Sequence, residues 1–332
     1  MKKLVKRSII IIFCFGLFSV HAQVGIKKVA QSTMGFLKVG VSPKAAAMGN
    51  AYTAVCNDVE SMFYNPAGLA EIPDAGLSAF LSQTQWIADI NYLAGGLARN
   101  FGTLGTFGIS FLSVDYGDIQ GVELVSLSDP QGYRLTGNLD IGAYALGLAY
   151  ARRISTQFSM GGLVQYVGQN LGDSRLDNGT VENSVDKVIF NFGIKYQTDF
   201  KRFRFAMAIR NFSTDVKYEE ISVQMPMVFM VGMGIDVLQV ISPDYQGDPF
   251  LISVEFLHPN NYTERVNIGS EYTLIGVLAL RAGYEFNRDL AGFSAGFGIR
   301  PEIGGKLFEL SYSYSDMQVF DAVNRLSFTF AL

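Results

Sequence analysis

The sequence predicts an all-β protein: a 14-stranded antiparallel transmembrane β-barrel with a short N-terminal plug-like segment. Hydrophobic residues make up 49% of the 332 residues, yet no long apolar run follows residue 22. A membrane-spanning helix needs about 20 consecutive apolar residues, so the sequence predicts no such helix beyond that point. The apolar residues instead alternate with small or polar ones, which is the period of two of a β-strand.

Segment 323–332 shows the alternation clearly, with Leu326 and Phe328 on one face and Arg325 and Ser327 on the other. The alternative fold is a soluble β-sandwich, whose inward face is bulky and apolar. Here the face opposite the large apolar residues carries mainly Gly, Ala, Ser and charged side chains. Because such a face suits a polar barrel interior, we favour a barrel with Phe, Leu and Tyr directed toward lipid.

Fourteen alternating segments account for residues 75–332, which we assign to the barrel. Most are about 9–11 residues long, the length with which a tilted strand crosses the hydrocarbon layer. An even number is typical of single-chain bacterial barrels. The predicted strands are 76–83, 90–99, 103–112, 139–151, 156–167, 187–197, 202–210, 226–236, 249–257, 263–272, 276–285, 290–300, 306–315 and 323–332.

The lengths of the connections support this assignment. In outer-membrane barrels short periplasmic turns alternate with longer outer loops. The predicted short turns are 100–102, 152–155, 198–201 and 273–275, and the long loops of opposite parity are 113–138, 168–186 and 211–225. The connection 237–248 is too long for a simple periplasmic turn, so a strand beside it could be misassigned.

Residues 1–22 are typical of a cleavable secretory signal peptide. Basic residues open the segment, an apolar stretch runs from Ser8 to Val20, and Val20-His21-Ala22 suits cleavage before Gln23. A membrane anchor is the alternative, but about a dozen apolar residues are too few to span a bilayer as a helix. The segment therefore predicts export, and together with the barrel it predicts the cell outer membrane, whose lipid is the first expected partner.

Composition excludes several classes of function. Without residues 1–22, which contain four of the 26 Lys and Arg, the chain holds 22 basic and 30 acidic residues, a formal charge of −8. That balance argues against nucleic acid as a partner. Cys56 cannot form an internal disulfide alone, and His258 is the one histidine left for a zinc site or a Ser–His hydrolase. We therefore predict no enzyme, no catalytic residue, no metal and no cofactor.

The alternation directs a set of charged side chains into the barrel lumen. Charges at membrane depth are tolerated only where they face water or partners. One interpretation is a salt-bridged lumen that supports the wall, and the other is a polar path or a docking surface for a plug. The predicted lumen charges are Lys187, Lys195, Arg202, Arg204, Arg210, Glu255, Arg265, Glu271, Arg281, Glu285, Arg300, Glu309 and Arg325.

Residues 23–74 show no sustained alternation, and we assign them to a plug-like segment. Ala45–Met48 favours a brief helix, and Asn65-Pro66-Ala67-Gly68 has the chemistry of a turn. A short folded segment before a barrel either lies in the lumen as a plug or forms a periplasmic tail. The residues alone leave both alternatives open.

The block at 35–72, GFLKVGVSPKAAAMGNAYTAVCNDVESMFYNPAGLAEI, resembles the N-terminal signature of the PorV/PorQ family of outer-membrane proteins, which are relatives of FadL-type barrels. Asn50 and Cys56 depart from the glycine and the small residue expected there. The resemblance implies a 14-stranded barrel in the outer membrane. It also implies that Asn65, Pro66, Ala67 and Gly68 form a structural motif that seats the plug at the start of strand 1.

The resemblance implies two functions. Some PorV/PorQ members belong to the type IX secretion system, where they bind or shuttle exported proteins, so a secretion translocon and secreted cargo would be partners. That hypothesis places functional surface on the long loops. More distant FadL-type relatives take up hydrophobic small molecules, which requires an apolar pocket behind the plug. The charged lumen argues mildly against an apolar conduit.

Overall fold

A computed structural model describes residues 32–125, 131–176, 179–198, 203–218, 221–242, 244–288, 290 and 292–332. The predicted signal peptide and Arg202, one of the predicted lumen charges, lie outside the described residues. No helix within these ranges is long and apolar enough to cross a membrane.

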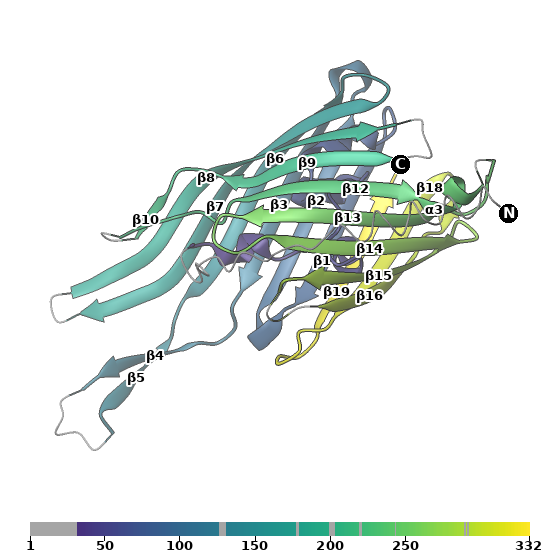
Figure 1. Ribbon diagram of the computed structural model, residues 1–332. Helices are drawn as coiled ribbons and strands as arrows, with labels where there is room; N and C mark the ends of the chain where they lie inside the picture. The colour runs from purple at the N-terminus through teal and green to yellow at the C-terminus, as the bar shows by residue number, and fades with distance from the viewer. Residues whose placement is uncertain are drawn as a thin grey trace.

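Fourteen of the described strands form one closed antiparallel wall (Figure 1). Each predicted strand corresponds to one of them, and β19 closes the ring by pairing with β1, for example Ala331 with Ser78. The 14-stranded barrel predicted from the alternation is therefore confirmed. The wall strands are β1 (Leu77–Gln85), β2 (Asn91–Asn100), β3 (Thr106–Asp115), β6 (Ile141–Arg153), β7 (Phe158–Leu176), β8 (Gly179–Gln197), β9 (Arg204–Phe212), β12 (Val228–Asp236), β13 (Phe250–Pro259), β14 (Arg265–Leu274), β15 (Leu278–Phe286), β16 (Phe293–Ile299), β18 (Lys306–Ser315) and β19 (Val323–Ala331).

The two faces of the wall differ in the way that the alternation requires. On β6, Leu146 and Leu148 point outward and are exposed, whereas Ala145 and Ala149 point inward and are buried. Large apolar side chains thus face the lipid. The small inward residues leave space in the lumen for other parts of the chain.

One end of the barrel carries the short turns, among them those that hold η5 (Gly102–Leu104) and β17 (Glu302–Ile303). The long connection 237–248 also lies at this end and contains the helix α3 (Val237–Ile241). Its Asp248 carboxylate accepts hydrogen bonds from the backbone N–H groups of Ile275 (2.6 Å) and Gly276 (3.0 Å) in the next turn. The helix accounts for the length, and the strands on either side are assigned correctly.

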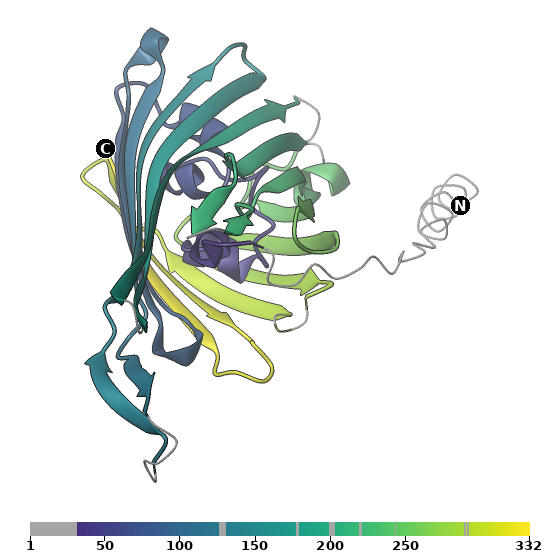
Figure 2. The same cartoon turned by 90° about the vertical axis from the view of Figure 1, so that its left-hand side faces the viewer.

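The opposite end carries longer structures, and all three predicted long loops are in part strands. Region 113–138 contains a separate ribbon of β4 (Gln120–Leu124) and β5 (Tyr133–Asn138), which projects beyond the wall (Figures 1 and 2). Region 168–186 belongs largely to β7 and β8, which have 19 residues each and extend past the other strands. This end also holds η4 (Ile87–Asp89) and the small hairpin of β10 (Val216–Tyr218) and β11 (Ile221–Val223).

Described residues of the N-terminal segment lie inside the ring of strands (Figure 2). The backbone N–H of Thr33 donates to Gln224 O (3.1 Å) at the long-loop end, and the segment reaches β1 at the short-turn end. Met48, Met62 and Leu69 are fully buried. We call residues 32–74 the plug. Its helices are η1 (Gly35–Lys38), α2 (Pro43–Ala47), η2 (Val59–Phe63) and η3 (Pro66–Glu71).

Candidate functional site: the plug, its anchors and two lumen cavities

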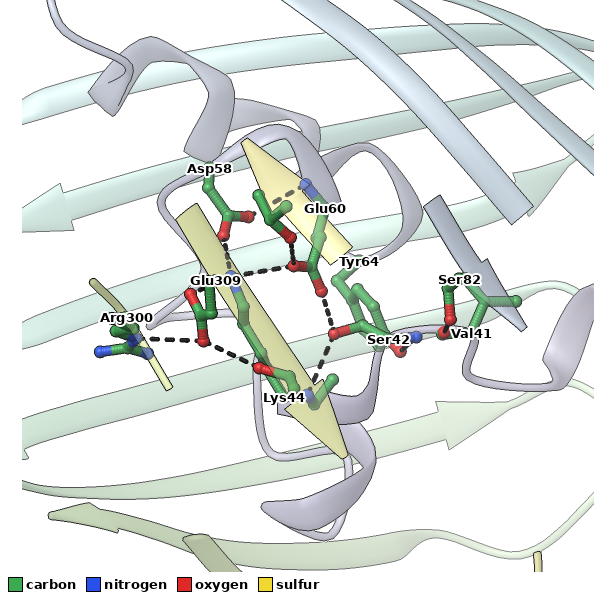
Figure 3. A network of polar contacts seen from close by, with 12 residues as sticks. Val41, Ser42, Lys44, Asp58, Glu60, Tyr64, Ser82, Arg300 and Glu309 are labelled. Carbon is green, nitrogen blue, oxygen red and sulfur yellow. Dashed lines mark hydrogen bonds and ion pairs between the residues drawn. The ribbon is translucent and has the colours of Figure 1, made fainter. Parts of the chain in front are cut away.

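A buried lysine of the plug stands at the centre of an ionic network (Figure 3). Lys44 Nζ lies 2.6 Å from Asp58 Oδ2, 2.9 Å from Glu60 Oε1 and 2.8 Å from Glu309 Oε2 of the wall. Ser42 caps α2, because its hydroxyl accepts from Ala45 N–H (3.3 Å), and the same hydroxyl donates to Glu60. The capping residue thus also orients a carboxylate toward the lysine.

The network continues into the wall strands. Glu309 lies 2.9 Å from Arg281 Nη2 and 3.0 Å from Arg300 Nε. Both arginines also contact Glu271, Arg281 Nε at 2.5 Å and Arg300 Nη2 at 3.2 Å. We call these residues the anchoring cluster. Its members are Lys44, Asp58, Glu60, Glu271, Arg281, Arg300 and Glu309.

Burial and the neighbouring charges set the protonation of the plug groups in this cluster. Burial alone would lower the pKa of Lys44, but Asp58, Glu309 and Glu60 outweigh it and raise the pKa. Burial raises the pKa of Glu60, and Lys44 offsets part of that rise. Lys44 therefore stays charged, and it is the cation that compensates Asp58 and Glu60, whereas Glu309 also pairs with Arg281 and Arg300.

The Asn-Pro-Ala-Gly motif anchors the plug at a different place. Asn65 Nδ2 donates to Thr53 O (3.1 Å) within the plug and to Ile194 O (3.2 Å) of β8, while its Oδ1 accepts from Ala67 N–H (3.1 Å) and caps η3. A Cβ on Gly193 would lie only 1.8 Å from that Oδ1. The motif therefore rests against β8. That it also seats the plug at the start of strand 1 stays a prediction.

Several predicted lumen charges hold the plug backbone. Glu255 accepts from the N–H groups of Tyr52 (3.1 Å) and Thr53 (2.8 Å). Arg325 Nε donates to Gly40 O (2.8 Å). Lys195 contacts both Glu71 and the carbonyl oxygen of Cys56. The backbone carbonyls and N–H groups of the plug, which lack sheet partners, are thus paired with wall charges.

The remaining predicted charges lie nearer the ends of the barrel. Arg210 Nη2 donates to Leu37 O (3.2 Å), and Glu285 accepts from Asn50 Nδ2 (2.8 Å). The Arg265 guanidinium lies 4.7 Å from the centroid of the Tyr262 ring. Two others lie elsewhere: Lys187 Nζ donates to Asp215 O (3.2 Å), and Arg204 lines a cavity at the short-turn end.

Sequence reasoning did not single out Lys44, Asp58 or Glu60, because isolated charges in a segment without periodicity have no pattern to mark them. Pro43 and the alanines that follow indicate a helix start, and Lys44 lies within it. The position of Lys44 in the first turn of this helix was the one feature of the sequence that could have drawn attention to it. Among the described residues, no group of three or more His, Cys, Asp or Glu side chains is arranged to hold a metal ion.

A cavity of about 80 Å³, the outer cavity, lies on the long-loop side of the plug. Apolar side chains such as Leu37, Val228 and Leu257 line part of it. Four cations, Lys38, Arg210, Arg265 and Arg288, and two carboxylates, Glu255 and Glu285, line the rest. The charges of the lining therefore sum to an excess of two positive charges.

Polar groups converge on the outer cavity. Lys38 Nζ lies 5.0 Å from the centroid of the Tyr262 ring. Burial, with Arg265 and Arg288 nearby, lowers the pKa of Lys38. The buried side-chain oxygens of Asn50 and Asn267 accept no hydrogen bond from the described residues. An anion here would relieve the repulsion among the cations, and a donor group could bond the amide oxygens.

A larger cavity of about 590 Å³, the inner cavity, opens on the short-turn side. Lys44, Glu271, Arg300 and Glu309 of the anchoring cluster line it, together with apolar residues that include Leu251. The plug thus separates two cavities. The ionic network that holds it is exposed to the inner one.

No protein-family model and no curated protein matches the chain. Solved structures do. The toluene transporter TbuX of Ralstonia pickettii superposes with a TM-score of 0.55 at 13% identity, over 88% of this chain and 97% of that one. The toluene transporter TodX of Pseudomonas putida gives 0.53 at 12% identity, and a FadL homologue of Pseudomonas aeruginosa gives 0.51 at 12%, both over 88% of this chain and 97% of the other. The chain therefore shares the fold of FadL-type outer-membrane barrels.

Proposed function

We propose that the protein is an outer-membrane channel that takes up small molecules combining an apolar body with an anionic group. The outer cavity carries this proposal, because its apolar lining and its excess of two positive charges match the two halves of such a molecule. A volume of about 80 Å³ has room for several water molecules at roughly 10–15 Å³ each. That is sufficient for a carboxylate and the carbon atoms next to it, so the tail of a longer acid such as octanoate would extend beyond the cavity.

The comparisons support a transport role of this general kind. The proteins TbuX and TodX, which share the fold, are described as toluene transporters. Toluene has no charge, whereas the outer cavity is lined by four cations and two carboxylates. The substrate class proposed for this chain therefore differs from a plain hydrocarbon by its acidic group.

Passage through the barrel requires displacement of the plug. The outer cavity ends at plug residues such as Asn50 and Tyr64, and the inner cavity begins at Lys44 and Asp58 on the other side. A molecule bound in the outer cavity contacts the cations beside the plug. Its passage then depends on release of the anchoring cluster.

Binding of octanoate and toluene to the purified protein, measured by calorimetry, tests the proposal. We expect octanoate to bind, and Lys38→Met or Arg265→Met to weaken it about tenfold, since a charge-assisted hydrogen bond contributes about 1.5–3 kcal/mol. Arg99→Met is the control, because Arg99 is exposed on the outer wall. The proposal would be contradicted if toluene and octanoate bound equally well, or if neither Lys38→Met nor Arg265→Met changed the affinity for octanoate.

A second candidate is a role in protein secretion of the PorV/PorQ type. The resemblance of residues 35–72 supports it, and so does the ribbon that projects from the long-loop end. Deletion of the gene separates the two candidates. Loss of secreted proteins, with co-purification of a secretion translocon, would favour this one, whereas intact secretion with impaired uptake of organic acids would favour the channel.

A further inference from the structure

The ribbon formed by β4 and β5 is a sheet of its own. Among the described residues its strands pair with each other alone, from Gln120 opposite Asn138 to Leu124 opposite Tyr133, with an irregularity between Gly121 and Val122. Figures 1 and 2 show it beyond the end of the barrel, on the side of the long loops. Because short turns mark the periplasmic end of such barrels, the ribbon stands outside the cell.

One face of the ribbon is apolar and exposed. Val122 and Leu135 are directly opposite each other, and Tyr133 lies two residues from Leu135 on the same face; their exposed fractions are 59%, 55% and 50%. The other face carries the ion pair of Arg134 Nη2 and Glu123 Oε2 at 2.7 Å. An isolated two-stranded ribbon is marginal in water, and an apolar face of this kind favours a covering partner.

The ribbon also presents free strand edges. Both strands belong to a two-stranded sheet, so within the part of the chain that the structure describes each has one neighbouring strand and one open edge. Unpaired N–H and C=O groups on such an edge are a template for another extended chain. A strand added there would place every second side chain beside the apolar face.

Charge distinguishes among the possible occupants. The described residues of 115–140 contain four acidic side chains, Asp115, Asp118, Glu123 and Asp140, and one basic side chain, Arg134. The excess negative charge disfavours a phosphate-bearing lipid surface and a second, equally acidic copy of the ribbon. It favours a partner that brings apolar and basic groups together.

We infer that the β4–β5 ribbon binds an extended segment of another protein, added as a third strand, in which apolar side chains alternate with Lys or Arg. The apolar side chains cover Val122, Tyr133 and Leu135. The basic ones approach the acidic residues at the base of the ribbon. This interaction is separate from the passage of small molecules through the lumen.

A short synthetic peptide in which valine and lysine alternate is the probe, and full-length protein in nanodiscs of zwitterionic lipid is the receptor. Fluorescence anisotropy measures binding. We expect saturable binding that Val122→Ser with Leu135→Ser weakens about tenfold or more, because two apolar contacts are lost. Asp118→Asn with Asp140→Asn should weaken it and reduce its dependence on salt.

The control is Val319→Ser with Phe320→Ser, which changes an exposed apolar pair on another loop at the same end and should leave binding unchanged. The inference is overturned if a valine–glutamate peptide binds as tightly as the valine–lysine peptide. It is also overturned if the Val122 and Leu135 substitutions leave the affinity unchanged. Dimerisation through the ribbon in sedimentation measurements also overturns it. So does insertion of the ribbon into lipid, reported by a fluorophore at residue 122.

Discussion

Replacing Lys44 by methionine removes the one plug cation on which Asp58, Glu60 and Glu309 converge within 3 Å. Methionine has a similar length, so the change removes charge with little change in packing. Glu60 and Glu309 then remain buried, Asp58 remains partly buried, and only Glu309 keeps arginine partners, Arg281 and Arg300. We expect the plug to detach from the wall far more often, while the barrel itself stays folded.

Breaking a buried ion pair by removing one partner costs about 3–5 kcal/mol. Each 1.4 kcal/mol corresponds to about a factor of ten in an equilibrium constant. Lys44 has three carboxylates within ion-pair distance, so we take this range as applicable. The population of the detached state should rise between about a hundredfold and a few thousandfold.

The thiol of Cys56 measures that population. It is fully buried, it donates to the carbonyl oxygens of Thr53 (3.5 Å) and Asn65 (3.7 Å), and burial raises its pKa to about 11. In the closed plug it is therefore inaccessible and protonated at pH 8. The rate of maleimide labelling, measured with Cys14 replaced by serine, follows detachment.

Lys306→Met is the matched control, because Lys306 is exposed at the short-turn end. Adding Glu309→Gln and Glu60→Gln to Lys44→Met should return the rate toward that of the wild type, since the uncompensated charges are then gone. Electrophoresis without heating checks that the barrel is intact. If Lys44→Met changes the labelling rate by less than about threefold, the anchoring cluster does not hold the plug.

Three further predictions concern the fit of the plug, its cations and the faces of the wall. Gly283→Ala should accelerate Cys56 labelling, because its Cβ would lie 2.1 Å from plug backbone atoms. Gly162→Ala should not, since its Cβ would meet Asn191 and Phe192 at 3.7 Å, an ordinary contact distance. Octanoate should bind more weakly as the pH rises through the pKa of Lys38, because only the protonated amine attracts the anion. That pKa lies below the ordinary lysine value of about 10.4. Titration calorimetry across pH checks this, and Lys38→Met, which lacks the titrating amine, is the reference. A nitroxide at Leu280, which is exposed, should report lipid in EPR relaxation, and one at the buried Arg281 should not.

The wall was predictable because each transmembrane strand has one face toward lipid and the other toward the lumen, and the two faces need different side chains. Leu146 and Leu148 face lipid and Ala145 faces the lumen, so the period of two is repeated in every strand. The same rule cannot say where a strand stops once it leaves the membrane. For that reason the outer parts of β7 and β8 were interpreted as loop, and α3 as an irregularity.

The plug contacts were less predictable, because they depend on pairs far apart in the sequence. Alternation indicates that Glu309 and Arg281 point inward, but not that Lys44 reaches them. The position of Asn65 against Ile194 depends on a close approach that Gly193 permits. A glycine in a strand indicates that another part of the chain can approach closely, but not which residue does so.

The anchoring cluster is ionic, and this explains how the plug can be held firmly against the wall and still be released. Apolar packing would hold it at least as well, since exchanging a buried ion network for well-packed apolar residues is often neutral or stabilising. Charges differ in that water restores their solvation once it reaches them. The inner cavity borders Lys44, Arg300 and Glu309, so water there is adjacent to the network. Release of these groups therefore leads into solvent, whereas release of an apolar contact would expose its surface to water. On this basis we propose that the charges of the anchoring cluster hold the plug against the wall and, in the same contacts, close the barrel lumen.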